Sequence, residues 1–428
     1  MATSSEAVLA LEKVRILDLT MAWAGPMAIR FLADMGAEVI KIEAASHMDR
    51  WRGGTFAQRG TERYPGHQPG ERPWNRSSFF NTQNRNKLSL VLDLKAPEGK
   101  SIFKRLVAVS DMVAENFSAG AMDRLGLDYP ELRAIKPDLV MLSMPALGRT
   151  GPQRDFIAHG PTIEELAGTT YLQGYPDGPP LPSGGLAWGD PMAGMMGATA
   201  ALVALVQRQA TGRGQHIDLS HLEAGVALNF DAILDYTVRG QLRGRRGNHH
   251  TSMAPHGAYR CRGEDRWIAI AIGSDDEWSR LRTAMGDPAW AVDERFASVL
   301  GRWEHQADLD AHLADWTTQH EHRELSGTLQ AHGVAASPVL DAAELSEDRH
   351  LHARGFFEEV THAESGRHQY PGMPWKLSLT PGRIRYPAPR FGEHNEHVLV
   401  NVLGLQPCEV RALEEAGVIA REPDPQGD

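Results

Sequence analysis

The sequence is poor in cysteine and in basic residues, and both shortages exclude classes of protein. Cys261 and Cys408 are its only cysteines, too few for a disulfide framework or a cysteine-based zinc site. We therefore expect a reducing compartment, the cytoplasm. The 44 Lys and Arg residues are outnumbered by 55 Asp and Glu residues, and the net charge is −11. Such an acidic chain argues against nucleic acid or an anionic membrane as its main partner.

Long apolar runs and targeting signals are also missing. Residues 1–12 lack the basic region followed by an apolar stretch that marks a secretory signal, and no run approaches the roughly 18 apolar residues of a membrane-spanning helix. The longest apolar segment, 192–206, is rich in Ala and Gly. It predicts a buried helix, and no membrane partner is expected.

Several common site motifs are absent. The turn after the first predicted strand is Ala22-Trp23-Ala24-Gly25-Pro26 rather than G-x-G-x-x-G, and neither G-x-x-x-x-G-K-[ST] nor G-x-S-x-G occurs. A dinucleotide fingerprint, a P-loop and a serine-hydrolase elbow are therefore disfavoured. The 19 histidines include the pairs 249–250 and 320/322, but residues at these spacings do not share a helix face, so no metal site is predicted.

The first 150 residues alternate β-rich runs with helical patterns, which is typical of a parallel α/β sheet. A polar stretch over 48–76 shows no period and predicts a long loop or lid. At least five strands are expected. The predicted strands and helices cover residues 14–19, 26–35, 38–43, 88–92, 97–109, 111–115 and 139–144.

The rest of the chain predicts an interrupted organisation. We expect a large domain over 1–238, a small α+β domain over 239–340, and a final part over 341–428 that returns to the large domain. The predicted elements are loops around a short helix over 162–168, the buried helix, a strand over 216–219, a long helix over 222–238, a strand pair over 257–262 and 267–272, and a last amphipathic helix over 395–403.

Gly189-Asp190-Pro191, at the start of the buried helix, is the most informative local motif. An Asp N-cap followed by Pro at the first helical position is a common start signal, and this alone favours a structural role. Two features favour a catalytic one. The helix is apolar on nearly every face, which places its N-terminus in the interior, and a Pro/Gly-rich approach brings that end to the loop cluster. The positive field of the helix terminus is expected to stabilise the ionised carboxylate as a nucleophile.

Other candidate residues have two interpretations each. Asn116, Phe117 and Arg124 follow a predicted strand and suit an anionic or adenine-bearing ligand, although an Arg on a solvated helix is equally common. Lys87 faces either phosphate or water. His159 is either an acid/base group or a hydrogen-bonding loop residue.

Taken in order, a series of segments resembles the class III CoA-transferases, the formyl-CoA transferase-like family that also includes α-methylacyl-CoA racemases. The resemblance covers nearly the whole chain. It is carried by residues 15–20, 24–26, 32–43, 86–87, 115–117, 122–127, 190–194 and 211–215.

The resemblance implies a Rossmann-like large domain built from the N- and C-terminal parts, an inserted small α+β domain, and a homodimer of interlocked, ring-like subunits. It makes Asp190 the expected nucleophile of an acyl-CoA:carboxylate CoA-transferase that forms an aspartyl mixed anhydride and then an aspartyl-CoA thioester. Acyl-CoA and a carboxylic acid are the implied substrates, and no cofactor beyond CoA is implied. The CoA contacts carry over to Trp23, Ala24, Lys87, Asn116, Phe117, Arg124 and Leu125.

The sequence departs from the formyl-CoA transferase branch at two places. Ala44 stands where that branch has an arginine, and residues 248–255 stand where it has a run of glycines. Residues 158–162 and 175–178 are closer to branches that use succinyl-CoA with larger acids, so succinyl-CoA is a candidate donor. The alternative is a racemase in which His159 and Asp190 form the acid/base pair.

Overall fold

The computed structural model describes residues 8–53, 61–182 and 187–425. The chain divides into two compact units, which we call the large and the small unit. The large unit consists of Met1–Thr169, Pro182–Arg239 and Ala353–Asp428, and the small unit of Thr170–Leu181 and Gly240–His352. The small unit thus extends past the predicted end at residue 340 and includes a short segment that composition did not reveal.

A six-stranded parallel sheet forms the centre of the large unit. Its strand order, β3-β2-β1-β4-β5-β6, reverses direction between β1 and β4, as in doubly wound nucleotide-binding sheets. The central strands are rich in Val, Ile, Leu and Met and are buried on both faces, as parallel sheets require, whereas the edge strand β6 is only partly buried. The predicted α/β fold is confirmed. The strands are Arg15–Asp18 (β1), Glu38–Glu43 (β2), Lys87–Val91 (β3), Met112–Glu115 (β4), Val140–Ser143 (β5) and His216–Asp218 (β6).

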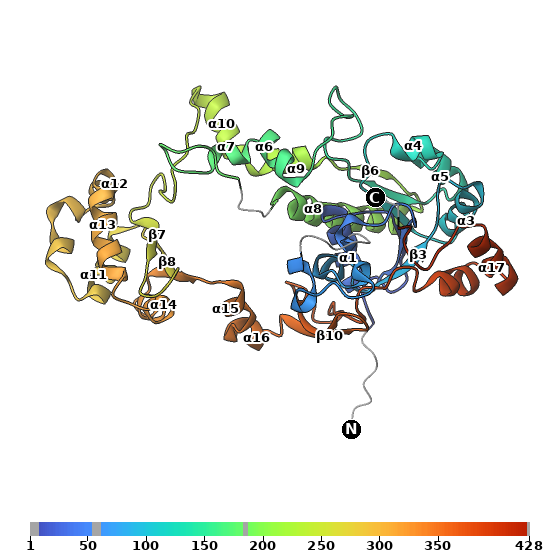
Figure 1. Cartoon of the computed structure of the whole chain (residues 1–428). Helices are drawn as coiled ribbons and strands as arrows, with labels where there is room; N and C mark the ends of the chain where they lie inside the picture. Colours follow the sequence, from blue (N-terminus) through green and yellow to red (C-terminus); the bar gives the residue numbers. More distant parts are fainter. Residues whose placement is uncertain (1–7, 54–60, 183–186, 426–428) are drawn as a thin grey trace. The chain divides into compact units, whose positions relative to one another are not determined.

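Helices cover both faces of this sheet. Ile16 points to a core formed with α1 and α8, whereas the next residue, Leu17, points to a core formed with α3, α5 and the C-terminal helices. This alternation follows from the two-residue period of a strand. Figure 1 shows α1 beside α8, and α3 beside α5. The helices are Ala24–Asp34 (α1), Ser78–Gln83 (α2), Pro97–Ala108 (α3), Ala121–Leu125 (α4), Tyr129–Ile135 (α5), Gly160–Leu166 (α6) and Gly189–Thr211 (α8), and Thr169–Leu172 (α7) belongs to the small unit except for its first residue.

Helix α8 is longer at both ends than the predicted 192–206. Among the described residues, it is the helix long and apolar enough by length and composition to cross a membrane, and half of its most apolar stretch is buried. It packs on α1, α9 and β5, as a core helix does. A Cβ at Gly194 would lie 2.8 Å from the Ala24 carbonyl oxygen, so a glycine is needed for this close approach of α8 to α1.

Two segments differ from the prediction. The helix expected over 222–238 is broken at Asn229 into α9 (His221–Leu228) and α10 (Phe230–Arg239), because the Asn229 amide donates to the Ala167 carbonyl at 2.7 Å. The expected loop over 48–76 contains short 3₁₀ turns, and its residues 54–60 lie outside the described part.

The C-terminal segment completes the large unit. Beside the edge strand β3, the Val91 N–H donates to Asn395 Oδ1 at 2.8 Å and the Ser89 N–H to His394 Nδ1 at 3.2 Å. The predicted helix over 395–403 is present, mainly as a short π-helix, His397–Val402, but it is not the last helix, because a further one follows. The remaining elements of this segment are β10 (Phe357–His362), β11 (Gly366–Pro371) and α17 (Pro407–Glu415).

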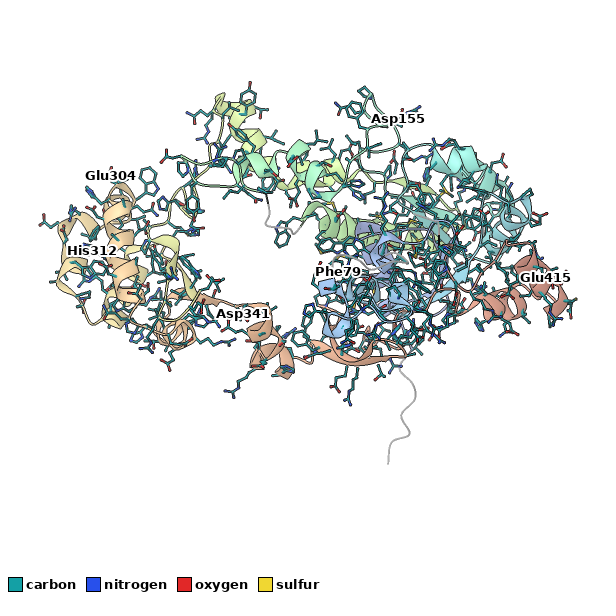
Figure 2. The ribbon with its side chains drawn as sticks, in the orientation of Figure 1. Phe79, Asp155, Glu304, His312, Asp341 and Glu415 are labelled. Atoms are coloured by element: carbon teal, nitrogen blue, oxygen red, sulfur yellow. The ribbon has the colours of Figure 1, made fainter. Side chains whose placement is uncertain are left out.

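The small unit is an antiparallel sheet of order β7-β8-β9 packed against helices. Its core contains Trp278, Phe296 and Leu313. The ring of His312, which is labelled in Figure 2, stacks on Trp290 with ring centres 4.8 Å apart. Pro338 obscured β9 in the sequence. The elements are His256–Arg260 (β7), Trp267–Ala271 (β8), Ala335–Val339 (β9), Asp275–Met285 (α11), Val299–Glu304 (α12), Gln306–Thr317 (α13), His322–Ala331 (α14), Ala342–Ser346 (α15) and Arg349–Ala353 (α16), whose last residue belongs to the large unit.

Candidate active site

A cavity of about 700 Å³ opens in the large unit where the parallel strands end. Ligands of doubly wound sheets bind at this edge, near the point where the strand order reverses. The cavity wall comes from the segments after β1, β2, β4 and β5 and from α6, α8 and α9. Its polar and aromatic members include Trp23, His47, Arg50, Trp51, Asn116, Phe117, Arg154, His159, Asp190 and His221.

The turn after β1 is fixed rigidly at this wall. The Asn116 side chain donates to the Met21 carbonyl and accepts from the Met21 N–H, both at 2.8 Å, and so joins the ends of β4 and β1. Ala22 has a positive φ of 63°, and its N–H donates to Asp49 Oδ1 at 3.0 Å. Asp49 is paired at 3.0 Å with Lys41, both side chains being fully buried. These contacts hold an uncommon backbone conformation beside the cavity.

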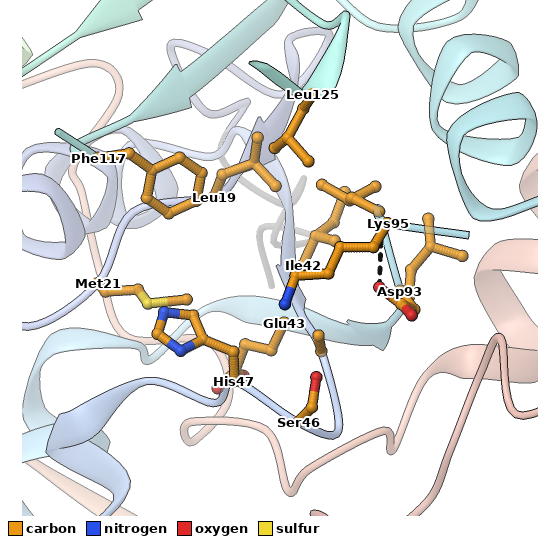
Figure 3. A pocket seen from close by; sticks show the side chains of 13 residues that line it. Leu19, Met21, Ile42, Glu43, Ser46, His47, Asp93, Lys95, Phe117 and Leu125 are labelled. Carbon is orange, nitrogen blue, oxygen red and sulfur yellow. Dashed lines mark hydrogen bonds between the residues drawn. The ribbon is translucent and has the colours of Figure 1, made fainter. Parts of the chain in front are cut away.

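A second cavity, of about 260 Å³, adjoins the first and shares Met21, His47 and Phe117 with it. In Figure 3 the side chains of Leu19, Ile42, Phe117 and Leu125 form an apolar wall. An apolar slot continuous with a more polar cavity suits an elongated ligand with an apolar, planar end.

Asp190 is the second residue of α8, and the predicted N-cap role is wrong. Trp188 caps the helix without a side-chain hydrogen bond. Since the Asp190 carboxylate is not used as a cap, it can face the cavity, where its side chain is 21% exposed.

The pKa of Asp190 is shifted in the direction opposite to the prediction. Burial raises the pKa of Asp190 to about 6, and the negative charge of Glu164 adds to this effect. Glu164 Oε1 accepts from the Gly189 N–H at 3.3 Å, next to the carboxylate in the chain. Loss of hydration and a like charge thus outweigh the field of the helix terminus. The carboxylate is weakly solvated and more basic than an ordinary Asp, which suits a nucleophile.

Gly160 makes room for the carboxylate. A Cβ at this position would lie 2.5 Å from Asp190 Oδ2 and 2.5 Å from the Ala187 Cβ. A side chain at residue 160 would therefore displace the carboxylate.

Two histidines border the same cavity. His159 precedes α6, its backbone N–H donates to Thr162 Oγ1 at 2.8 Å, and the residue is exposed. His221, the first residue of α9, is buried, with Nδ1 3.8 Å from Asp190 Oδ1. Burial lowers the pKa of His221 to about 4, so its ring is neutral at pH 7.

Most of the predicted CoA-binding residues lie at these cavities. Trp23, Ala24, Asn116 and Phe117 line the larger one, and Phe117 and Leu125 line the smaller one. Arg124 is an exposed residue of α4 and lines neither.

The structure argues against the predicted phosphate contact of Lys87. Its ammonium group is fully buried, 2.8 Å from Asp18 Oδ2, and also donates to Asn84 and to the Pro26 carbonyl. A ligand could reach it only by breaking a buried ion pair, which is costly.

Several residues of the site were not identified from the sequence: Arg50, Trp51, Arg154 and His221 line the larger cavity, and Glu164 lies close enough to raise the pKa of Asp190. None belongs to a motif, and only the fold brings them to Asp190. Within the described residues there is no group of three or more His, Cys, Asp or Glu side chains that could hold a metal ion.

The comparisons with known proteins agree with the geometry. Residues 11–395 match the family model described as CoA-transferase family III. A succinyl-CoA–D-citramalate CoA-transferase of Chloroflexus aurantiacus is 36% identical over 96% of this chain and 98% of its own length. A succinate–glutarate CoA-transferase of Agrobacterium fabrum is 32% identical over 92% of this chain and 95% of its own.

A solved structure supports the same assignment. The crystal structure of a CAIB/BAIF family protein from Brucella suis superimposes with a TM-score of 0.80 at 29% sequence identity, and covers 92% of this chain and 99% of its own. The predicted family and the predicted enzyme class, a CoA-transferase, are confirmed. The chain belongs to CoA-transferase family III.

Proposed function

We propose that this CoA-transferase moves CoA from a donor acyl-CoA to a free carboxylic acid, with Asp190 as the covalent nucleophile. The main support for this proposal is the Asp190 carboxylate, which is largely buried and lines the larger cavity. Burial and Glu164 raise its pKa to about 6. Above pH 6 it is ionised, and its poor solvation favours attack on a thioester carbonyl.

The proposed reaction has four steps. Asp190 attacks the donor thioester, which gives a mixed anhydride and CoA thiolate. The thiolate attacks the aspartyl carbonyl and releases the donor acid, leaving an aspartyl-CoA thioester. The acceptor carboxylate then attacks this thioester, and the thiolate finally takes the new acyl group and frees Asp190. Each step exchanges one activated acyl bond for another, so excluding water preserves the thioester energy.

The two joined cavities support a path for CoA. We place the adenine in the smaller cavity against Phe117 and Leu125, with the chain passing Asn116 toward Asp190. No cofactor other than CoA is proposed.

We propose succinyl-CoA as the donor, because the relatives named above act on succinyl-CoA or succinate. Arg50 and Arg154 line the larger cavity and supply positive charge for the distal carboxylate of a dicarboxylic acid. The interlocked homodimer and the cytoplasmic location expected from the sequence are also part of the proposal, and light scattering on the purified protein tests the dimer.

A racemase is the second candidate, and one observation favours it: His159 and Asp190 line the same cavity. In that case the two side chains would exchange the α-proton on opposite faces of the acyl group.

One experiment separates the two reactions. The protein is incubated in heavy water with acyl-CoA esters, including succinyl-CoA, and a pool of free carboxylic acids, and the products are analysed by mass spectrometry. Transfer gives new acyl-CoA masses that match acids of the pool. Deuterium at the α-carbon of an unchanged ester would instead identify a racemase. Full turnover by Asp190→Ala would refute the nucleophile assignment.

A further inference from the structure

His221 is a buried side chain that the proposed reaction does not yet use. Its ring is 7% exposed and lines the larger cavity. Neither ring nitrogen has a partner at normal hydrogen-bond geometry within the described part of the chain, although the Met144 backbone lies close enough to the ring to act as a weak acceptor. A buried polar group without a partner destabilises a fold, and such groups in native proteins require an explanation. A ligand or a reaction intermediate in the cavity can supply the missing partner.

The imidazole faces one particular atom of the nucleophile. His221 Nδ1 lies 3.8 Å from Asp190 Oδ1, whereas Oδ2 lies on the side of Gly160. The two carboxylate oxygens are therefore in different surroundings. This distance is longer than a hydrogen bond, but a movement of either side chain by about 1 Å would bring the two atoms to the usual hydrogen-bond distance of 2.7–3.2 Å.

The neutral state of the ring determines what it can do. Burial lowers the pKa of His221 to about 4, and the nearby backbone of Met144 only partly opposes this. An imidazolium would pair with Asp190 and hold its carboxylate as a weak nucleophile. A neutral ring has one N–H and leaves the carboxylate reactive. None of the four proposed steps gains or loses a proton, so a hydrogen-bond donor is sufficient.

We propose that His221 is a further catalytic residue, which donates its ring N–H to the carbonyl oxygen of acylated Asp190, the atom derived from Oδ1, when CoA thiolate attacks. This inference rests on the proposed function. In this step the sulfur–carbon bond to Cγ forms and the carbonyl π pair moves to the oxygen. The oxyanion then collapses, the bond from Cγ to the bridging anhydride oxygen breaks, and the donor acid leaves as a carboxylate that carries this former Asp190 oxygen. The N–H stabilises the transient oxyanion more than the starting carbonyl, which is what accelerates a reaction.

The test measures the donor half-reaction without an acceptor acid. Rapid-quench mixing with succinyl-CoA, followed by intact-protein mass spectrometry, gives the rate of aspartyl-CoA formation. His221→Leu removes the N–H and is expected to slow this rate roughly 100- to 1,000-fold. His221→Gln keeps an N–H donor and is expected to form the adduct at least tenfold faster than His221→Leu. His397→Leu, at an exposed position outside both cavities, is the matched control and should react like the parent.

Two further readouts exclude a merely structural role. Binding of a non-reactive thioether analogue of succinyl-CoA should change less than about threefold in His221→Leu. The infrared carbonyl band of the aspartyl-CoA thioester should lie at higher frequency in His221→Leu than in the parent or in His221→Gln, because a hydrogen bond to the carbonyl oxygen is lost. If the leucine variant does not fold, His221→Met, which fills similar space without an N–H, replaces it.

The outcomes distinguish the two proposals. If the parent enzyme forms no aspartyl-CoA adduct, the covalent mechanism fails and the role of His221 fails with it. If the parent forms the adduct and His221→Leu forms it equally fast, or if its carbonyl band is unchanged, the covalent mechanism stands and His221 has no catalytic role.

Discussion

Replacing Asp190 with Asn is expected to make the protein more stable while it abolishes transfer. Burial and Glu164 raise the pKa of Asp190 from 3.8 to about 6, and each unit corresponds to about 1.4 kcal/mol. The ionised carboxylate therefore costs the fold up to about 3 kcal/mol above pH 6. An amide has nearly the same shape and no charge, so Asp190→Asn removes this cost.

The sign of the pH dependence follows from the same shift. Between pH 4 and 6 the folded chain holds the Asp190 proton more tightly than the unfolded chain, so the parent loses stability as the pH rises through this window. The gain in Asp190→Asn should be close to zero near pH 4 and complete by pH 7.5. With an unfolding entropy of roughly 0.9 kcal/mol/K for a chain of this length, it corresponds to a rise in Tm of roughly 3 °C.

Thermal unfolding of the two proteins at pH 4.5, 6 and 7.5 checks this prediction. Asp155→Asn is the matched control, because Asp155 lies on an exposed loop (Figure 2) with its side chain 74% exposed, and it should change Tm by less than about 1 °C. A lower Tm for Asp190→Asn at pH 7.5, or a difference that does not vary with pH, would refute the assignment of a destabilised carboxylate.

Three other substitutions test contacts around the site. Gly160→Ala displaces the Asp190 carboxylate and should lower kcat by roughly 100-fold. If the variant keeps the circular dichroism spectrum and the kcat of the parent, the 2.5 Å approach of a Cβ at residue 160 to Asp190 Oδ2 is contradicted. Glu164→Gln removes a negative charge close to Asp190, so the acid limb of the pH profile of kcat/KM should move to lower pH. If the limb does not move, burial is the sole cause of the raised pKa of Asp190. Lys87→Met leaves Asp18 buried without its ion-pair partner and should lower the free energy of unfolding, measured in urea, by about 3–5 kcal/mol. The double variant Lys87→Met/Asp18→Leu should recover most of this stability. An equal loss of stability in the two variants would argue against the importance of the ion pair.

The sheet was predictable from sequence because its information is local. Runs such as 38–43 carry both their β-propensity and their burial in consecutive residues, and they alternate with helical patterns. The break between α9 and α10 and the division of the C-terminal helices were not predictable. They depend on hydrogen-bond partners that are distant in sequence, such as Ala167 for Asn229.

The candidate site was predictable in part. The motif over 189–191 singled out Asp190, and the family resemblance gave it the role of nucleophile, but its helix position was wrong by two residues because Trp188 already has helical dihedral angles. Lys87 was assigned to a ligand because nothing near it in the sequence reveals Asp18, 69 residues away, as its partner. His221 and Glu164 approach Asp190 only in the folded chain, so no local pattern could assign them.

The dependence of strand β3 on residues 394 and 395 has a consequence during synthesis. The hydrogen bonds that cover this edge come from about 300 positions later in the chain. At a ribosomal rate of 5–20 residues per second, residues 394 and 395 are synthesised roughly 15–60 s after β3. Throughout that time β3 presents unpaired N–H groups, which is the surface on which strands of neighbouring nascent chains can assemble. A chain that terminates after β6 but before residue 394 would never cover this edge. We therefore expect such products to be captured by chaperones or to aggregate, even though they contain all six strands of the sheet and Asp190.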